Sequence, residues 1–239
     1  MSVHIITHCY AVKLPQYAAF LRYQLSSLVL YPPSVPVKIT VCYSVADHRV
    51  VSVLGRFLEE ASELKLYCHA MPEPELFRRC IGRNAVGRKS DADAVWFTDV
   101  DYLFRYDCLD RLMDVCHETD DSVTLLYPRT VQVQREHHLG DELVAGAARA
   151  GQLLLDVDPS QFVPKRERKA IGGIQIARGS FVRQHGYLSG HRLQAPADRP
   201  FESFADDVAF RADCAKHGEV RGMELPGLFR LRHTRTSYQ

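Results

Sequence analysis

Two carboxylates, Asp99 and Asp101, follow a short run of bulky residues that ends in Trp96 and Phe97. A short apolar run bounded by charge predicts a buried strand of a parallel sheet, and open α/β sheets bind ligands beyond the carboxyl ends of such strands. Side chains at positions i and i+2 of an extended chain point the same way, so both carboxylates could converge on one cation. A hard divalent cation would offset the cost of burying them. The alternative is an ordinary turn after a strand, where Asp is common.

A second pair of acids, Asp206 and Asp207, lies at the start of a predicted helix over residues 204–216. Acidic side chains at this end of a helix are stabilised by the helix dipole. The simplest interpretation is that the two acids only cap the helix, which stabilises it by about 1 kcal/mol.

The elements that must position the first pair of acids alternate between strand and helix. Apolar spacing predicts strands at residues 3–6, 37–43, 64–69 and 93–98, and helices at 17–30, 50–63 and 76–89. Strands that alternate with helices indicate a mostly parallel sheet covered on both faces. The predicted fold class is therefore α/β, as one continuous domain.

The second half of the chain has a looser pattern. It predicts a helix at 108–117, a strand at 123–127, an Ala-rich helix at 141–155 and a strand at 171–178 that contains Gly172-Gly173. Glycines in a strand allow another group to approach the backbone closely. Residues 162–169 are predicted to be a charged, mobile connection, and the basic tail from residue 228 is predicted to be extended.

The composition is that of a soluble globular protein. The chain has 239 residues, of which 46% are hydrophobic and 25% charged, and a net charge of +1 gives no global case for nucleic-acid or membrane binding. No apolar stretch approaches the ~20 residues of a transmembrane helix, and the first residues lack the features of a signal peptide. Seven scattered cysteines without a C-x-x-C pair indicate reduced thiols and argue against a zinc site. A cytoplasmic location is expected.

Four motifs in this order resemble those of nucleotide-sugar-dependent glycosyltransferases with the GT-A fold, in particular the large inverting family. Arg83-Asn84-Ala85-Val86-Gly87, followed by Thr98-Asp99-Val100-Asp101, is similar to the R-N-x-G helix and the D-x-D motif. Ile5-Ile6-Thr7 and Asp47 lie where that family binds the nucleoside. Gly172-Gly173, Phe181 and Gly186-Tyr187 resemble its G-G…F…G-G-F segment, and residues 204–211 (FADDVAFR) resemble the start of its E-D-x-x-L-x-x-R helix.

The resemblance implies an inverting, metal-dependent transferase. Residues 1–104 would form the nucleotide-sugar-binding half and residues 105–239 the acceptor-binding half. Asp101 would bind Mn²⁺ or Mg²⁺ directly, Asp99 would contact the metal through water or hold the ribose, and His233 would complete the metal shell. The other implied donor-binding residues are Thr7, Asp47, Arg83, Asn84, Gly172 and Gly173. Asp207 would be the catalytic base, and Asp206 a cap or an acceptor-binding residue.

The sequence departs from the family pattern in three places. The usual Pro before the first-strand Thr is absent, Asp206 replaces Glu, and Gly186-Tyr187 stands for the second Gly-Gly. These departures concern the acceptor more than the chemistry. The expected donor is a nucleotide-diphosphate sugar, with a UDP-sugar as the first expectation. The acceptor hydroxyl could belong to a glycan, a lipid-linked sugar, a metabolite or a hydroxymethylated DNA base.

Basic clusters at residues 165–169 (KRERK) and at Arg230, Arg232 and Arg235 keep a nucleic-acid acceptor open. A nucleotidyltransferase on a similar fold is a second interpretation, which the lack of glycine in the first 13 residues disfavours. A third is an inactive nucleotide-binding module, which the retention of both acidic pairs disfavours.

Overall fold

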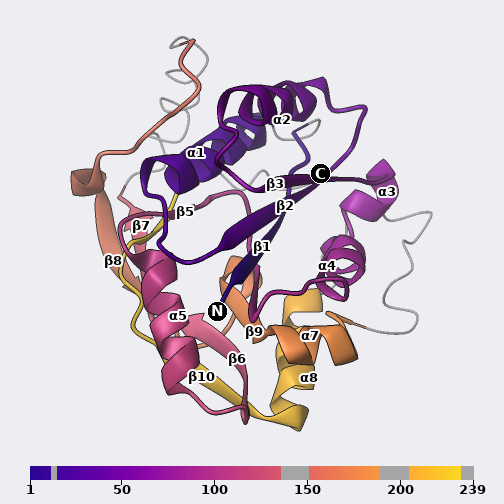
Figure 1. Ribbon diagram of the computed structural model, residues 1–239, viewed down its shortest axis with the longest axis vertical. Coiled ribbons are helices and arrows are strands. Elements are labelled where there is room, and N and C mark those ends of the chain that lie inside the picture. The colour runs from indigo at the N-terminus through magenta and orange to yellow at the C-terminus, as the bar shows by residue number, and fades with distance from the viewer. Residues whose placement is uncertain (12–14, 136–150, 189–204, 233–239) are drawn as a thin grey trace.

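The computed structural model describes residues 1–11, 15–135, 151–188 and 205–232. Its centre is a seven-stranded sheet in the order β10-β6-β9-β4-β1-β2-β3 (Figure 1). The strands of its first half are β1 (Val3–His8), β2 (Val37–Tyr43), β3 (Leu66–Ala70) and β4 (Ala94–Phe97), all parallel to their neighbours within this half. The predicted α/β architecture with a mostly parallel sheet is confirmed.

The second half of the chain supplies the other three strands of this sheet. They are β6 (Val123–Pro128), β9 (Gln175–Arg178) and β10 (Glu219–Met223). Strand β9 lies between β4 and β6 and runs antiparallel to both. Because strands from both halves belong to one sheet, the described residues form a single domain. The division of labour between the two halves stays a prediction.

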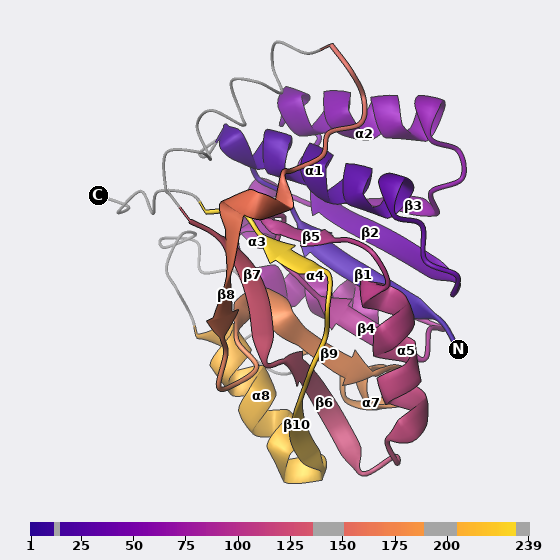
Figure 2. The same ribbon diagram turned by 90° about the vertical axis from the view of Figure 1, so that its left-hand side faces the viewer.

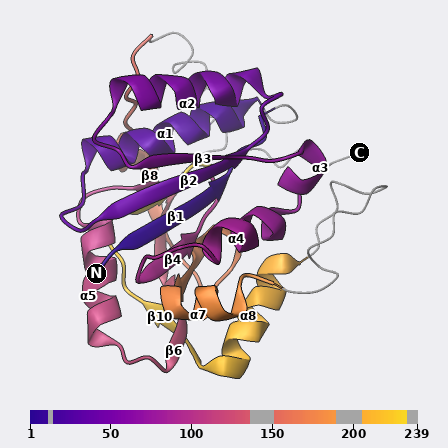
Figure 3. The ribbon, with the colours of Figure 1, turned by 45° about the vertical axis from the view of Figure 1, so that its right-hand side comes forward.

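Helices cover both faces of the sheet (Figure 2). On one face lie α1 (Gln16–Leu30), α2 (His48–Glu60) and α5 (Cys108–Glu118), which pack on Ile5, Ile39 and Trp96. On the other lie α4 (Arg79–Gly87), α7 (Gly179–His185) and α8 (Asp206–His217), which pack on Ile6 and Phe97 (Figure 3). Alternate residues of one strand thus belong to two different apolar cores, as the two-residue repeat of a strand requires.

A second sheet joins the loop after β4 to the end of the described chain. It has the order β5-β11-β7-β8, formed by β5 (Tyr102–Phe104), β11 (Leu228–Arg230), β7 (Thr130–Gln134) and β8 (Phe162–Arg166). Strand β11 pairs antiparallel with β5, and the Leu231 amide donates to the Asp101 carbonyl at 2.8 Å. Residues 228–231 of the basic tail are therefore held beside the D-x-D motif.

Four predictions of local structure are wrong in part. Residues 162–166 are strand β8, because they pair with β7. The strand predicted at 171–178 begins as a 3-10 turn, η2 (Gly172–Ile174), and only its second half is β9. The helix predicted at 76–89 is shorter, α4 (Arg79–Gly87), and a separate short helix, α3 (Glu73–Leu76), precedes it. Residues 151–155 are not helical, and most of that predicted helix lies outside the described residues.

Two expectations about the whole chain can be compared with the structure. All seven cysteines are free, and six of them are buried. No helix among the described residues is both long and apolar enough to cross a membrane.

Candidate active site

A small cavity lies at the carboxyl ends of β1 and β4. Its volume is about 60 Å³, and its walls come from the ends of both strands, from α1, α4 and the loop after β4, and from β11. The lining residues are His8, Tyr10, Tyr17, Arg79, Asp99, Val100, Asp101 and Arg230. Ligands of open α/β sheets bind at this edge, so both acids of the D-x-D motif lie where the strand pattern predicted.

Asp99 is held by two guanidinium groups from one face of α4. Its Oδ1 accepts hydrogen bonds from Arg79 and from Arg83, the latter at 3.1 Å. Burial by itself would raise the pKa of Asp99, but the guanidinium groups of Arg79 and Arg83 outweigh it and lower the pKa to about 2. Asp99 is therefore ionised throughout the physiological range.

Asp101 is paired with the basic tail. Its Oδ2 accepts a hydrogen bond from Arg230 Nε at 2.9 Å, and only 5% of the Asp101 side chain is exposed. Although burial would lower the pKa of Arg230, the Asp101 carboxylate raises it well above its usual range. The Arg230 guanidinium also lies 5.2 Å from the centre of the Tyr102 ring. Arg230 is therefore part of this site and not of an open basic surface.

The loop that carries the two carboxylates is fixed from α1. The buried Gln24 amide donates to the carbonyl oxygens of Asp99 and Tyr102, both at 3.0 Å. The Asp99 carbonyl also accepts the Tyr102 amide at 3.2 Å, so Gln24 adds a second, buried contact that ties the loop to α1. Gln24 therefore sets the direction in which the loop leaves β4.

Gly172 and Gly173 lie against Asp99, as their predicted role in the donor site requires. A Cβ on Gly173 would stand 2.8 Å from the Asp99 amide nitrogen and 2.5 Å from the Tyr102 ring, so no side chain fits there. Gly172 has φ +41°, and a Cβ there would stand 3.4 Å from Asp99 Oδ2. Trp96 Nε1 donates to the Gly173 carbonyl at 3.0 Å and anchors this turn to β4.

The Gly172-Gly173 turn also brings Asp207 close to the D-x-D motif. Its Oδ2 accepts the Gly172 amide at 3.1 Å. Because the amide nitrogen and the Cβ of one residue are about 2.5 Å apart, the Oδ2 atoms of Asp207 and Asp99 lie within roughly 9 Å of each other. Asp207 Oδ1 accepts no hydrogen bond from the described residues. One oxygen of this carboxylate is therefore positioned and the other is available to a ligand.

Asp206 points to a different neighbour. Its Oδ1 lies 3.6 Å from Arg78 Nη2, and its side chain is 15% exposed. Burial is the main cause that raises the pKa of the Cys80 thiol to about 12, and the negative charge of Asp206 is the second. Asp206 thus connects the start of α8 to the start of α4, and its acceptor-binding role stays a prediction.

A chain of buried hydrogen bonds connects Asp99 with the start of α8. Arg83 donates to Asp99 and, at 2.8 Å, to the Tyr187 hydroxyl. That hydroxyl donates to Gln175 Oε1 at 2.7 Å, and Gln175 Nε2 donates to the Asp207 carbonyl at 2.8 Å. Burial raises the pKa of Tyr187 to about 12, so the hydroxyl keeps its proton. Moving either acid would disturb this network, which therefore fixes their separation.

Of the predicted donor-binding residues, Arg83, Gly172 and Gly173 lie against Asp99 without lining the cavity, and Thr7, Asp47 and Asn84 do not line it either. Thr7 is fully buried, Asp47 accepts the Val50 amide at the start of α2, and Asn84 Oδ1 accepts the Tyr187 amide at 3.1 Å. These contacts give Asp47 and Asn84 a structural role, and donor binding by the three residues stays a prediction. His233 lies outside the described residues.

The sequence interpretation missed the part that four residues play in the site. Arg79 was missed although it lies one helical turn before Arg83, a spacing that puts both side chains on one face. Gln175 was missed, and Tyr187 was named only as part of the Gly186-Tyr187 motif, because nothing local identifies a hydrogen-bond network. The fourth residue is His8, which is buried beside the cavity; burial, Arg83 and Arg79 lower its pKa well below its usual range. Neither ring nitrogen of His8 has a hydrogen-bond partner among the described residues.

The donor atoms at this cavity suit a hard divalent cation in part. Carboxylates of Asp99 and Asp101 line one cavity, and Oδ2 of Asp99 accepts no hydrogen bond from the described residues. Oxygen ligands of this kind are those that Mg²⁺ and Mn²⁺ prefer. No group of three or more His, Cys, Asp or Glu side chains gathers at one point in the described part of the chain. The protein could therefore supply two ligands here, with a bound ligand and water supplying the others.

Comparison with known proteins identifies the fold. No family model matches the sequence, and no curated protein matches it. Among solved structures, S. aureus TarS residues 1–349 in complex with UDP-GlcNAc aligns with 98% of this chain at 12% identity and a TM-score of 0.59. Mannosyltransferase PcManGT from Pyrobaculum calidifontis, in complex with GDP-Man and Mn²⁺, aligns with 99% at 16% identity and a TM-score of 0.53. Mouse xyloside xylosyltransferase 1 aligns with 96% at 13% identity and a TM-score of 0.51.

The coverage of these structures differs. The chain spans 59% of that TarS chain and 58% of the mannosyltransferase, but 97% of the xylosyltransferase. At these identities the likeness shows the fold alone. The predicted GT-A-like fold of glycosyltransferases is confirmed.

Proposed function

We propose that this chain is a glycosyltransferase that moves a sugar from a nucleotide-diphosphate sugar to a hydroxyl acceptor, with inversion. One observation carries the proposal beyond the fold. The Gly172-Gly173 turn lies against Asp99 and binds Asp207 through its amide, so the two acids of separate motifs lie within roughly 9 Å. A separation of this size leaves room for a sugar between a leaving group at Asp99 and a base at Asp207.

Asp207 would act as the general base. Inverting transfer needs one base on the face of the sugar opposite the leaving group, to take the proton of the attacking hydroxyl. The Gly172 amide donates a hydrogen bond to Asp207 Oδ2. Oδ1 would therefore be free to take the proton from the hydroxyl group of the sugar acceptor. Asp206, which is held by Arg78, would position the start of α8.

The basic side chains around the cavity would bind the diphosphate. Arg79 lines the cavity with 38% of its side chain exposed, whereas Arg83 is 2% exposed and faces Tyr187 and Asp99. We therefore assign direct phosphate contact to Arg79 and a positioning role to Arg83. A planar guanidinium group suits a phosphate because it offers two parallel donors.

Asp101 and Asp99 would hold Mn²⁺ or Mg²⁺, which supplies Lewis-acid stabilisation of the negative charge on the leaving group. Support comes from their oxygen donors and from the Mn²⁺ in the mannosyltransferase of the same fold. Arg230 would have to share or release Asp101 Oδ2 when the metal binds. His233 remains a proposed third ligand.

A UDP- or GDP-sugar is the proposed donor. Two of the structures of similar fold contain a nucleotide sugar, UDP-GlcNAc in TarS and GDP-Man in the mannosyltransferase. Thr7 and Asp47, near the ends of β1 and β2, would bind the nucleoside. A DNA base is the weaker acceptor proposal, because two basic side chains that suggested it are already paired. Arg230 pairs with Asp101, and Lys165 pairs with Glu167.

The test is a thermal-shift panel of UDP-, GDP- and TDP-sugars with Mn²⁺, because a specific ligand stabilises the folded state in proportion to its occupancy. One donor should raise the melting temperature in the wild type, and Asp101→Asn should lose the metal-dependent part of that shift. Donor hydrolysis should accompany binding and fall when EDTA is added. A protein that binds a donor but hydrolyses none would be a binding module, and the proposal would be wrong.

A further inference from the structure

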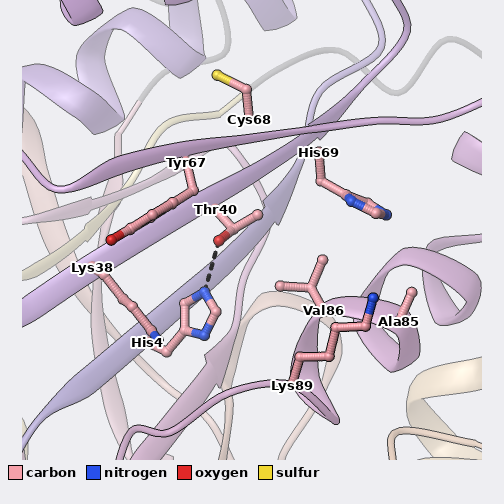
Figure 4. A pocket seen from close by; sticks show the side chains of 9 residues that line it. All are labelled: His4, Lys38, Thr40, Tyr67, Cys68, His69, Ala85, Val86 and Lys89. Atoms are coloured by element: carbon pink, nitrogen blue, oxygen red, sulfur yellow. Dashed lines mark hydrogen bonds between the residues drawn. The ribbon is translucent and has the colours of Figure 1, made fainter.

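A second cavity lies beneath the edge of the main sheet, on the face covered by α4 (Figure 4). Its volume is about 310 Å³, and it shares no lining residue with the candidate active site. Its walls come from β1, β2, β3 and the end of α4, and they are formed by His4, Lys38, Thr40, Tyr67, Cys68, His69, Ala85, Val86 and Lys89. His4 and His8 are four residues apart on β1, so the two cavities lie about 13 Å apart along the strand.

The face of the sheet that forms this cavity is unusually polar. The register places Thr40 beside Tyr67 on one row and His69 beside Cys42 on the next. The opposite face of the same strands carries Ile5, Ile39 and Leu66, which are buried in the core. Parallel strands covered on both faces are normally apolar throughout. The polar face is therefore not explained by packing, and α4 leaves it open to solvent.

The polar side chains on the floor of the cavity, His4 and Lys38, already have partners within the protein. The His4 ring is hydrogen-bonded to Ser90 Oγ at 2.9 Å and to Thr40 Oγ1 at 2.8 Å. Burial is the main cause that lowers the pKa of His4 to about 4, and the positive charge of Lys38 is the second. His4 is therefore neutral at pH 7 and is not the group that attracts a ligand. Lys38 pairs with Asp91, an exposed carboxylate outside the cavity.

Three side chains in the walls of the cavity are available to bind a ligand. The side chains of Lys89, His69 and Tyr67 make no hydrogen bond or ion pair with any of the described residues. None of the nine lining residues is acidic, so the Lys89 ammonium has no carboxylate at the cavity. Figure 4 shows Lys89 reaching from the end of α4 toward the side on which His69 descends from β3. An ammonium group with no counter-ion in a partly enclosed site attracts an anion.

The remaining walls suit a planar, apolar group. Tyr67 is 55% exposed and faces the cavity with Val86 and Ala85 on the helix side. A cavity of 150 Å³ holds benzene, so about 310 Å³ holds one ring and a charged group. Small-ligand sites combine apolar walls with a few polar groups in this way.

We propose that this cavity is a second ligand site, which binds a small organic anion made of a planar ring and a phosphate or carboxylate group. Lys89 and His69 bind the anionic group, and the ring lies between Tyr67 and Val86. The site is separate from the proposed donor site, and the proposal does not depend on the chain being a glycosyltransferase.

Phenyl phosphate is the probe that tests this proposal, by isothermal titration calorimetry on the full chain. The wild type should bind it with a dissociation constant on the order of 0.1 mM, as expected for a ligand of this size. Lys89→Ala should weaken binding at least about tenfold, the effect of losing one charge-assisted hydrogen bond. Lys216→Ala removes an equal charge from α8, far from the cavity lining, and should leave the affinity unchanged.

A third variant decides where the probe binds, because the guanidinium groups of the candidate active site could also hold phosphate. Arg79→Ala should leave phenyl phosphate affinity unchanged. The proposal is overturned if the wild type shows no saturable binding, if Lys89→Ala and Lys216→Ala weaken it equally, or if Arg79→Ala removes it. Inorganic phosphate and phenol should each bind more weakly than phenyl phosphate; equal binding of phosphate would contradict the ring contact.

Discussion

Asp99→Asn should destabilise the protein by an amount that depends on pH in a defined way. The carboxylate of Asp99 accepts hydrogen bonds from Arg79 and Arg83, and its side chain is 26% exposed. Arg83 is nearly buried, so the substitution leaves a buried guanidinium without a counter-ion on that side. The amide of Asn has a similar shape, which keeps the loss mainly electrostatic.

The magnitude follows from the pKa of Asp99, which is about 2 against an ordinary value of 3.8. A difference of this size corresponds to roughly 2 to 3 kcal/mol of stability at pH 7. Because the pKa is lower in the folded state, this contribution is complete above about pH 5 and decreases as the pH falls through the window from 4 to 2. About half of it should remain at pH 3.

The measurement is urea unfolding followed by the fluorescence of Trp96, the only tryptophan, which is fully buried between the sheet and α1. The difference between wild type and Asp99→Asn is measured at pH 7, 4 and 3. Asp213→Asn, which removes an exposed partner of Lys216 on α8, is the matched control and should show almost no pH-dependent difference. A difference that is small at pH 7, or constant down to pH 3, would refute the assigned pairing.

Three further predictions concern the proposed reaction and its turn. Asp207→Asn should lower sugar transfer about 10²- to 10⁴-fold, the usual contribution of a general base, with donor affinity unchanged by calorimetry; wild-type turnover would place the base elsewhere. Gly172→Ala should cost about 1 kcal/mol in urea unfolding, because φ is +41° and the new Cβ faces Asp99; equal stability would contradict this. EDTA should weaken nucleotide binding without abolishing it, since Arg79 and Arg230 remain at the cavity; complete loss in a titration would contradict that.

Much of the fold was predictable because its first half obeys simple periodicity. Strands β1, β2 and β4 are short apolar runs, and α1 ends near Pro32-Pro33 as predicted. The second half was harder, because its structure depends on partners distant in sequence. Strand β8 ends in Lys165-Arg166, the first two residues of the KRERK run, and is a strand because β7 pairs with it. Likewise, η2 forms where the Gly172-Gly173 turn must pass Asp99, which no local pattern indicates.

The site was predictable where its residues have motif spacing, and not where contacts define it. Asp99, Gly172 and Asp207 come together as the ordered motifs implied, although they are separated by 73 and 35 positions in the chain. Tyr187 and Gln175 connect the two acids, yet the motif that includes Tyr187 does not indicate its hydrogen bonds, and a buried glutamine has no signature in a single sequence.

The pairing of guanidinium groups with the two carboxylates changes the expected role of a metal. The sequence suggested that a divalent cation is needed to offset the burial of Asp99 and Asp101. The structure places Arg79, Arg83 and Arg230 on them, three positive charges against two negative ones. These carboxylates are therefore compensated in the folded protein before any ligand binds. A metal at this cavity would stabilise the negative charge on the departing diphosphate and would not be needed for folding. Chelation should therefore lower turnover much more than stability.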